Sequence, residues 1–72
     1  MPVDILVKVG RRLRYFRTQR GISQTVIAEQ AGITRRALSS IENGKAEAGL
    51  RTLYDLTQAL GIKLVDLFGN VD

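Results

Sequence analysis

The 72-residue sequence contains no cysteine, no histidine and no tryptophan, and only one proline, Pro2. Without cysteine, the chain can form no disulfide, no thiolate nucleophile and no thiolate metal site. Without histidine, it also lacks the commonest general base and the commonest metal ligand. We therefore expect no catalytic residues, no metal site and no bound cofactor, and we do not expect an enzyme.

Long apolar runs are also missing. No stretch approaches the roughly 18 apolar residues that a membrane-spanning helix needs. The first ten residues, MPVDILVKVG, lack the basic region and the small-residue cleavage site of a secretory signal. We expect a cytoplasmic protein without a membrane partner, in which residues 1–72 form one small domain.

Acidic residues are few relative to basic ones. Eleven Lys and Arg stand against seven Asp and Glu, for a net charge of +4, and nine of the eleven basic residues precede position 46. A basic first part suits a polyanion such as nucleic acid. Many small domains carry a similar charge as an ordinary solvated surface, so charge alone leaves both interpretations open.

Four glycines divide the chain into helical segments. Each of them, Gly21, Gly32, Gly44 and Gly61, follows a segment with helical periodicity, where a left-handed residue commonly ends a helix. Ser23 and Thr34 occupy N-cap positions two residues after the first two glycines. No strand-like alternation intervenes, and we predict an all-α, five-helix fold with helices over residues 4–20, 24–31, 35–43, 50–60 and 63–68.

One further glycine falls inside the first predicted helix. Gly10 weakens that helix by roughly 1 kcal/mol relative to alanine. We therefore expect the turns before Gly10 to be irregular. The predicted core consists of apolar residues at helical spacing on the first four helices: Val9, Leu13, Phe16, Ile27, Ala28, Ala31, Ile33, Leu38, Ile41, Leu50, Leu53, Leu56 and Leu60.

The most informative segment is SQTVIAEQAGITRRALSSIENGK, residues 23–45. Two short helices joined by a glycine turn are typical of a helix-turn-helix, whose second helix enters the DNA major groove. Within that second helix, Leu38 and Ile41 face inward. The opposite face is polar, and arginine and serine there suit hydrogen bonding to base edges. We expect base reading by Arg35, Arg36, Ser39 and Ser40, rather than the ordinary solvated face that such residues form on most helices.

Three further residues are candidates for phosphate contacts. Gln24 starts the first helix of the pair, where free backbone N–H groups and the helix dipole attract an anion. Asn43 and Lys45 flank Gly44 just after the second helix. Contacts of this kind set the register of a protein on DNA and carry little sequence information.

A structural ion pair is expected between Arg17 and Glu42. Both residues border the apolar stripes of their predicted helices, and their pairing would join the first helix to the reading helix. Arg11 and Arg14 face away from the stripe, and we expect them to form an ordinary solvated face.

Taken together, RRLRYFRTQRGISQ, IAEQAGITRRALSSIENGK, LRTLYDLTQALGI and the final VDLF resemble the Cro and phage-repressor (XRE-type) family of helix-turn-helix transcriptional regulators. The resemblance covers about residues 9–68 and implies a lambda-repressor-like fold and dimeric binding to near-palindromic operators. The sequence departs from the family in AEAGL, residues 46–50, where many relatives carry a proline. Matched position by position, the family implies phosphate contacts, base reading and an ion pair at the residues already assigned these roles: Gln24, Asn43, Lys45, Arg35, Arg36, Ser40, Arg17 and Glu42.

Apolar residues near the C-terminus suggest a twofold homodimer, with Tyr54 and Val65 at the interface. The leading interpretation is a sequence-specific regulator of transcription, a repressor or autoregulator, with double-stranded DNA as its partner. The alternative is an antitoxin-type module that holds a cognate toxin and binds DNA secondarily. A phage repressor, a restriction-modification controller and an antitoxin all fit the sequence.

Overall fold

A computed structural model describes residues 4–69, and in this part of the chain all regular structure is helical. The predicted all-α class is therefore confirmed. The five observed helices differ from the predicted ranges by at most one residue at either end. They are α1 (Ile5–Gln19), α2 (Gln24–Ala31), α3 (Arg35–Glu42), α4 (Leu50–Leu60) and α5 (Leu64–Phe68).

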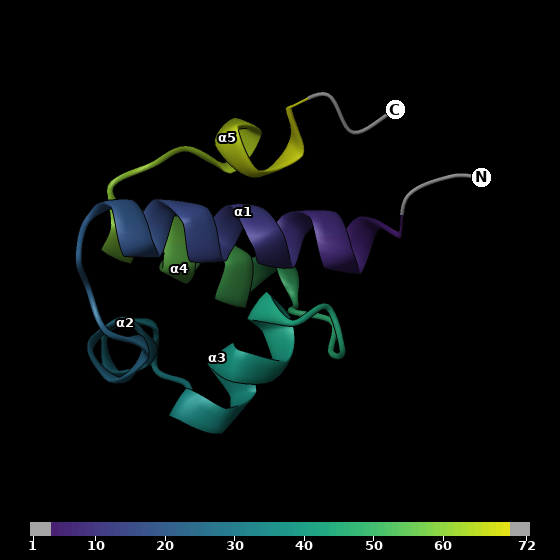
Figure 1. The fold of residues 1–72 in the computed structure, drawn as a ribbon. Helices are drawn as coiled ribbons and strands as arrows, with labels where there is room; N and C mark the ends of the chain where they lie inside the picture. Colours follow the sequence, from purple (N-terminus) through teal and green to yellow (C-terminus); the bar gives the residue numbers. More distant parts are fainter. Residues whose placement is uncertain (1–3, 70–72) are drawn as a thin grey trace.

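The first helix organises the others. In Figure 1, α1 crosses the middle of the molecule, with α5 above it, α2 and α3 below it, and α4 behind it. α1 contacts α3 and α5, while α2 contacts α3 and α4. The α2–α3 pair is therefore held from two directions, by α1 on one side and by α4 on the other.

Local capping sets the ends of the α2–α3 pair. Ser23 Oγ accepts a hydrogen bond from the Val26 N–H at 3.2 Å, and Thr34 Oγ1 accepts one from the Ala37 N–H at 3.0 Å. The four glycines predicted to end helices all have left-handed φ angles, between 65° and 72°. These caps satisfy backbone groups that a helix leaves unpaired at its ends. Both predictions are confirmed.

The core forms where the apolar faces of the helices meet. Most of the predicted positions are buried in it: Val9, Leu13, Ile27, Ala28, Ala31, Leu38, Ile41, Leu56 and Leu60. Phe16, Ile33 and Leu53 are half-buried and pack against this core. Ile62 and Leu67 are also buried and close it from the C-terminal side.

Leu50 is a predicted core residue that the structure places elsewhere. It begins α4 and is 74% exposed, so its assignment to the core is wrong. The inward face of α4 instead includes Thr57, which is 1% exposed. Thr57 tolerates burial because its hydroxyl donates to the Tyr54 carbonyl oxygen at 2.7 Å. Apolar spacing along the sequence cannot identify such a position, because threonine is polar and its burial depends on this hydrogen bond.

Gly10 lies within a regular helix, so the predicted irregularity before it is wrong. Asp4 caps α1, accepting a hydrogen bond from the Leu6 N–H at 2.8 Å. Gly10 is buried, and a Cβ atom there would overlap the carbonyl oxygens of Ile41 and Glu42, at 2.6 Å from the latter. The absence of a side chain therefore lets α1 approach the last turn of α3.

Arg12 ties α5 to α1, a contact that the sequence analysis did not predict. Its Nη1 donates to the Asp66 carbonyl oxygen at 3.0 Å, and its Nη2 donates to the Gly69 carbonyl oxygen at 2.8 Å. Carbonyls at a helix C-terminus lack intrahelical partners, and a cation there is favourable. Arg12 therefore stabilises the docking of the short C-terminal helix.

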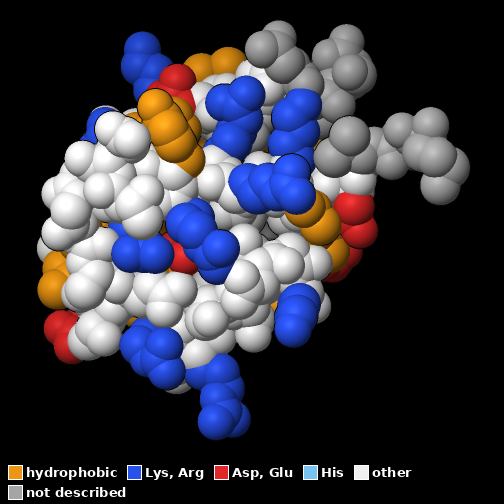
Figure 2. All heavy atoms as spheres, viewed as in Figure 1, with side chains coloured by type: hydrophobic (Ala, Val, Ile, Leu, Met, Phe, Trp, Pro, Cys, Tyr) orange, Lys and Arg blue, Asp and Glu red, His pale blue; other side chains and the backbone are white. Residues whose placement is uncertain are grey.

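Basic side chains dominate one face of the molecule. In Figure 2, Lys and Arg side chains are spread from top to bottom over the face that carries α1 and α3, whereas acidic side chains show mainly near its margins. Among the described residues, no helix is long and apolar enough to cross a membrane.

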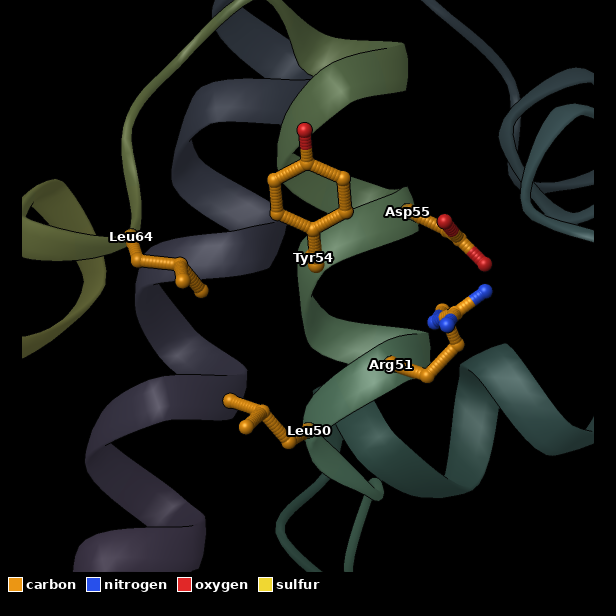
Figure 3. A pocket seen from close by; sticks show the side chains of 5 residues that line it. All are labelled: Leu50, Arg51, Tyr54, Asp55 and Leu64. Carbon is orange, nitrogen blue, oxygen red and sulfur yellow. The ribbon is translucent and has the colours of Figure 1, made fainter.

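An apolar groove lies between α4 and α5. It is lined by Leu50, Tyr54 and Leu64 together with the charged residues Arg51 and Asp55. Figure 3 shows the two leucines on one side of Tyr54, and Arg51 and Asp55 on the other. Val65, the second residue predicted for a dimer interface, is 66% exposed next to this groove but does not line it.

Candidate nucleic-acid interface

The candidate site is built on α3, whose two faces differ sharply. Leu38 and Ile41 are 1% and 6% exposed and anchor the helix in the core. Arg35 and Arg36 begin the helix and are exposed. The fold therefore presents two arginine side chains at the start of a helix whose opposite face is packed in the core.

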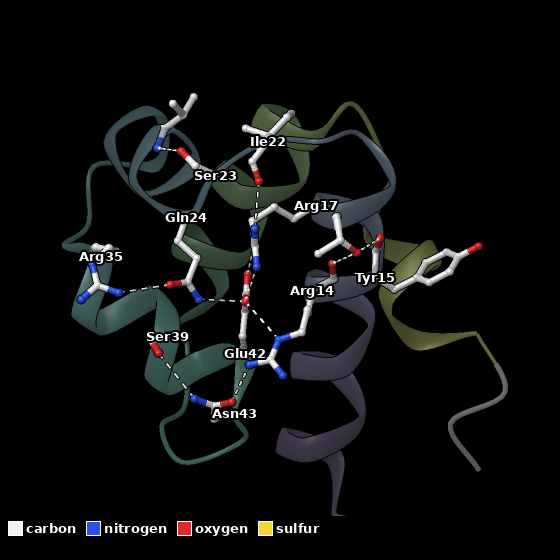
Figure 4. A network of polar contacts seen from close by, with 12 residues as sticks. Arg14, Tyr15, Arg17, Ile22, Ser23, Gln24, Arg35, Ser39, Glu42 and Asn43 are labelled. Atoms are coloured by element: carbon white, nitrogen blue, oxygen red, sulfur yellow. Dashed lines mark hydrogen bonds and ion pairs between the residues drawn. The ribbon is translucent and has the colours of Figure 1, made fainter.

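Glu42, in the last turn of α3, is the centre of a polar network. The residue is only 3% exposed. Its carboxylate accepts hydrogen bonds from Arg17 Nε at 2.7 Å, Arg17 Nη2 at 3.1 Å and Gln24 Nε2 at 3.0 Å. Arg17 also donates from Nη1 to the Ile22 carbonyl oxygen at 2.8 Å. The ion pair expected from the sequence is present and joins α1 to α3. Figure 4 shows that Gln24 adds α2 to the same network.

The environment of Glu42 lowers the pKa of its carboxyl group. Burial by itself would raise that pKa, because it disfavours the charged form. Hydrogen bonds from Arg17 and Gln24, the charge of Arg17 and a hydrogen bond from Arg14 outweigh burial and hold the pKa below its ordinary value of 4.5. The carboxylate is therefore charged at neutral pH and can hold its cationic partners.

Gln24 connects this network to the start of α3. While its Nε2 donates to Glu42, its Oε1 accepts a hydrogen bond from Arg35 Nη1 at 3.3 Å. The structure thus brings together a residue predicted for phosphate contact and one predicted for base reading. The spacing of the two residues along the sequence did not indicate this bridge.

Arg14 belongs to the same network, so its assignment to an ordinary solvated face is wrong. Its Nε lies 3.4 Å from Glu42 Oε1, and its Nη2 donates to Asn43 Oδ1. Gly10 and Arg14 stand one turn apart on α1, on the side that meets α3. The close approach at Gly10 brings Arg14 over the end of α3, which helical spacing alone could not reveal.

The turn after α3 differs in one respect from the turns that end α1, α2 and α4. The Lys45 N–H donates to the Ser40 carbonyl oxygen at 2.9 Å, and the Gly44 N–H donates to the Ile41 carbonyl oxygen at 3.1 Å. This is a Schellman motif, in which the residue after the glycine is commonly apolar and packs back on the helix. That position holds isoleucine after α1, α2 and α4, but after α3 it holds the exposed Lys45.

The remaining predicted residues lie along α3. Ser39 and Ser40 are half-buried. Asn43 Nδ2 donates to Ser39 Oγ at 3.4 Å, so the Asn43 carboxamide contacts a hydroxyl one turn earlier on the helix. Arginine, asparagine and lysine donors together suit an acceptor-rich ligand such as nucleic acid. In the described part of the chain, no three acidic, cysteine or histidine side chains are grouped to hold a metal ion.

Comparison with known proteins agrees with this geometry. The Helix-turn-helix family matches residues 13–67. The chain is 36% identical over 70 residues to the control protein C.MunI of Mycoplasma sp., covering 96% of this chain and 95% of that protein. It is 39% identical over 59 residues to the HTH-type transcriptional regulator PuuR of Escherichia coli, covering 82% of this chain but only 32% of that longer protein.

A solved structure shares the fold along almost its whole length. The restriction-modification controller protein C.AhdI from Aeromonas hydrophila superposes with a TM-score of 0.85 and 38% sequence identity, covering 88% of this chain and 96% of that one. The family of these relatives consists of transcriptional regulators and is not a class of enzymes. The chain belongs to the XRE-type helix-turn-helix family of DNA-binding transcriptional regulators.

Proposed function

We propose that the protein is a sequence-specific regulator that reads double-stranded DNA with α3. The observation that carries this proposal is the placement of Arg35 and Arg36, exposed in the first turn of a helix whose other face is buried. Arginine pairs bidentately with the O6 and N7 atoms of guanine in the major groove. Ser39 and Ser40 follow along the same helix and add shorter hydrogen-bonding groups.

Phosphate contacts bracket this reading surface. Gln24 stands at the N-terminus of α2, and its Nε2 keeps a second N–H beyond the one that Glu42 accepts. Asn43 and Lys45 stand at the opposite end, after α3. Lys45 occupies a position where the ends of α1, α2 and α4 carry isoleucine, which favours a role outside the core. These three groups would fix the orientation of α3 in the groove.

The protein acts as a twofold homodimer on a near-palindromic operator in this proposal. A groove lined by Leu50, Tyr54 and Leu64, with Val65 exposed beside it, supplies an apolar surface that a second copy can cover. A twofold interface uses the same patch on both subunits. The two reading helices would then lie about 34 Å apart, one turn of DNA.

Repression or autoregulation is favoured over toxin binding, because the relatives are described as transcriptional regulators and control proteins. Selection of bound duplexes from random DNA tests the whole proposal. We expect one enriched motif with two inverted half-sites, guanine-containing, whose centres are about one helical turn apart. Recovery of unenriched sequences, with equal affinity for all of them, would overturn sequence-specific reading. A single half-site without symmetry would overturn the dimer.

A further inference from the structure

Among the described residues that bond the Glu42 carboxylate, only Arg14 also bonds Asn43, the residue that follows α3. Its side chain is 47% exposed, compared with 13% for Arg17, so it lies at the outer edge of the network. Its Nε faces Glu42 Oε1 at 3.4 Å, and its Nη2 donates a hydrogen bond to Asn43 Oδ1. Figure 4 shows this side chain reaching from α1 to the last turn of α3.

The bond to Asn43 selects one of two orientations of its carboxamide. A carboxamide has an acceptor, Oδ1, and a donor, Nδ2, and rotation by about 180° about its terminal bond exchanges them. Arginine only donates, so it can bind the oxygen and not the nitrogen. The nitrogen is therefore turned away from Arg14, toward Ser39 Oγ at 3.4 Å. Its second N–H remains for another acceptor.

This orientation is the one that a DNA backbone requires. Phosphate oxygens accept hydrogen bonds and donate none, so an asparagine must present Nδ2 to them. We propose that Arg14 is a positioning residue for DNA docking, which holds the Asn43 carboxamide so that its free N–H points outward. The inference rests on the proposed function, because it deepens the role of Asn43 as a phosphate contact.

The position of Arg14 itself depends on buried parts of the fold. Glu42 is fixed by the two bonds from Arg17, at 2.7 and 3.1 Å, and it in turn orients the Arg14 guanidinium. Gly10 provides the close approach of α1 to α3 that makes both contacts possible. A side chain that is already ordered loses less conformational entropy on binding. Arg14 therefore raises DNA affinity through Asn43 and not only through its charge.

A charge-conserving substitution separates these two effects. Arg14→Lys keeps the positive charge but loses the planar fork that reaches two acceptors at once. We expect it to weaken binding to the selected duplex about fivefold, equivalent to ~1 kcal/mol. In an Asn43→Ala background the same substitution should have no further effect, because the side chain that Arg14 positions is absent. Arg11→Lys is the matched control on the same helix, and it should bind like the unmodified protein.

The experiment measures dissociation constants for the four proteins of this cycle and for the control, by fluorescence anisotropy with the selected duplex at several salt concentrations. Equal losses from Arg14→Lys with and without Asn43 would overturn the positioning role and make Arg14 an independent contact. Unchanged affinity in Arg14→Lys would also overturn it. If the unmodified protein binds no duplex, the proposed function itself is wrong. If the unmodified protein binds but the affinity losses of Arg14→Lys and Asn43→Ala simply add, only the proposed role of Arg14 is refuted.

A second measurement needs no DNA. The side-chain NH₂ group of Asn43 gives its own pair of signals in a ¹⁵N NMR spectrum. In the unmodified protein this group should be rigid, with a high heteronuclear NOE, and in Arg14→Lys it should become mobile while backbone signals away from α3 stay in place. A side chain that is equally rigid in both proteins would contradict the proposal even if affinity falls.

Discussion

Arg17 and Glu42 stand 25 positions apart in the sequence and are joined in the fold by two hydrogen bonds, of 2.7 and 3.1 Å. Their side chains are 13% and 1% exposed, so the pair is largely removed from water. Around it lie Gln24 of α2 and Asn43 after α3, which we propose for DNA contact, and Arg14 of α1, which we propose positions Asn43. The pair therefore connects the stability of the fold to the geometry of α3.

Neutralising Glu42 should destabilise the protein. Glu42→Gln leaves Arg17 without its buried counter-charge, and breaking such a pair costs about 3 kcal/mol. The pH dependence should change as well. Because the folded pKa of Glu42 lies below 4.5, its stabilisation is present above the unfolded pKa and is lost as the pH falls through the folded value.

Urea unfolding followed by circular dichroism between neutral and acidic pH measures both effects. The unmodified protein should lose stability on acidification, and Glu42→Gln should lose less. Glu47→Gln is the control, since Glu47 is exposed. If the stability of the unmodified protein and of Glu42→Gln depends on pH in the same way, the stabilising role of the charged Glu42 carboxylate is wrong.

Adding one methyl group at Gly10 should destabilise the fold. In most helices glycine to alanine is stabilising by roughly 1 kcal/mol. Here the new Cβ would overlap the carbonyl oxygens of Ile41 and Glu42. We expect Gly10→Ala to lower the free energy of unfolding by about 2 kcal/mol, a typical cost of overpacking a core. Gly69→Ala, whose Cβ would meet its nearest neighbour at 3.7 Å, should retain full stability in the same urea titration. Equal midpoints for the two variants would show that α1 and α3 can separate without cost.

Removing Arg36 should relax base preference. Arg36→Ala should cost about 1–3 kcal/mol on the selected duplex and should lower discrimination at one base pair of each half-site. Repeating the selection from random DNA with the variant measures that discrimination. Arg11→Ala removes the same charge from α1 and should leave the selected motif unchanged. An identical motif for Arg36→Ala would exclude Arg36 from base reading.

Removing Lys45 should act differently, because a phosphate contact carries no sequence information. Lys45→Ala should weaken binding to all duplexes about equally and should reduce the slope of log affinity against log salt by about 1. Lys63→Ala, at the start of α5, removes the same charge away from α3 and serves as the control. A salt slope that is unaltered in Lys45→Ala would place Lys45 away from the backbone.

A charge beside the α4–α5 groove should separate the proposed dimer. Val65 is 66% exposed, so Val65→Asp should leave the helical circular dichroism spectrum intact while its carboxylate opposes burial against a second copy. Sedimentation equilibrium should give a dimer for the unmodified protein and a monomer for the variant. Gln30→Glu on α2 changes the net charge equally and should remain dimeric. A monomeric unmodified protein, or a dimeric Val65→Asp, would refute this interface.

Helix ends were accessible to sequence analysis because their causes are local. Ser23 and Thr34 cap helices through N–H groups three residues away, and Gly21 and Gly32 end helices by their own backbone freedom. The core followed from spacing for the same reason, since a helix repeats every 3.6 residues wherever it occurs. Leu50 was the exception, because an exposed leucine in the first turn of α4 has the same local pattern as a buried one.

The sequence by itself determined where the helices lie, which face of α3 is polar, and that Arg17 and Glu42 stand at the borders of two apolar stripes. Only the tertiary structure decided how far α1 stands from α3. That distance depends on Gly10 meeting backbone carbonyls about 30 residues away, and it brings Arg14 to Asn43. The packing of α2 against α3 likewise brings Gln24 to Glu42. Such contacts join residues through space, so no periodicity along one helix contains them.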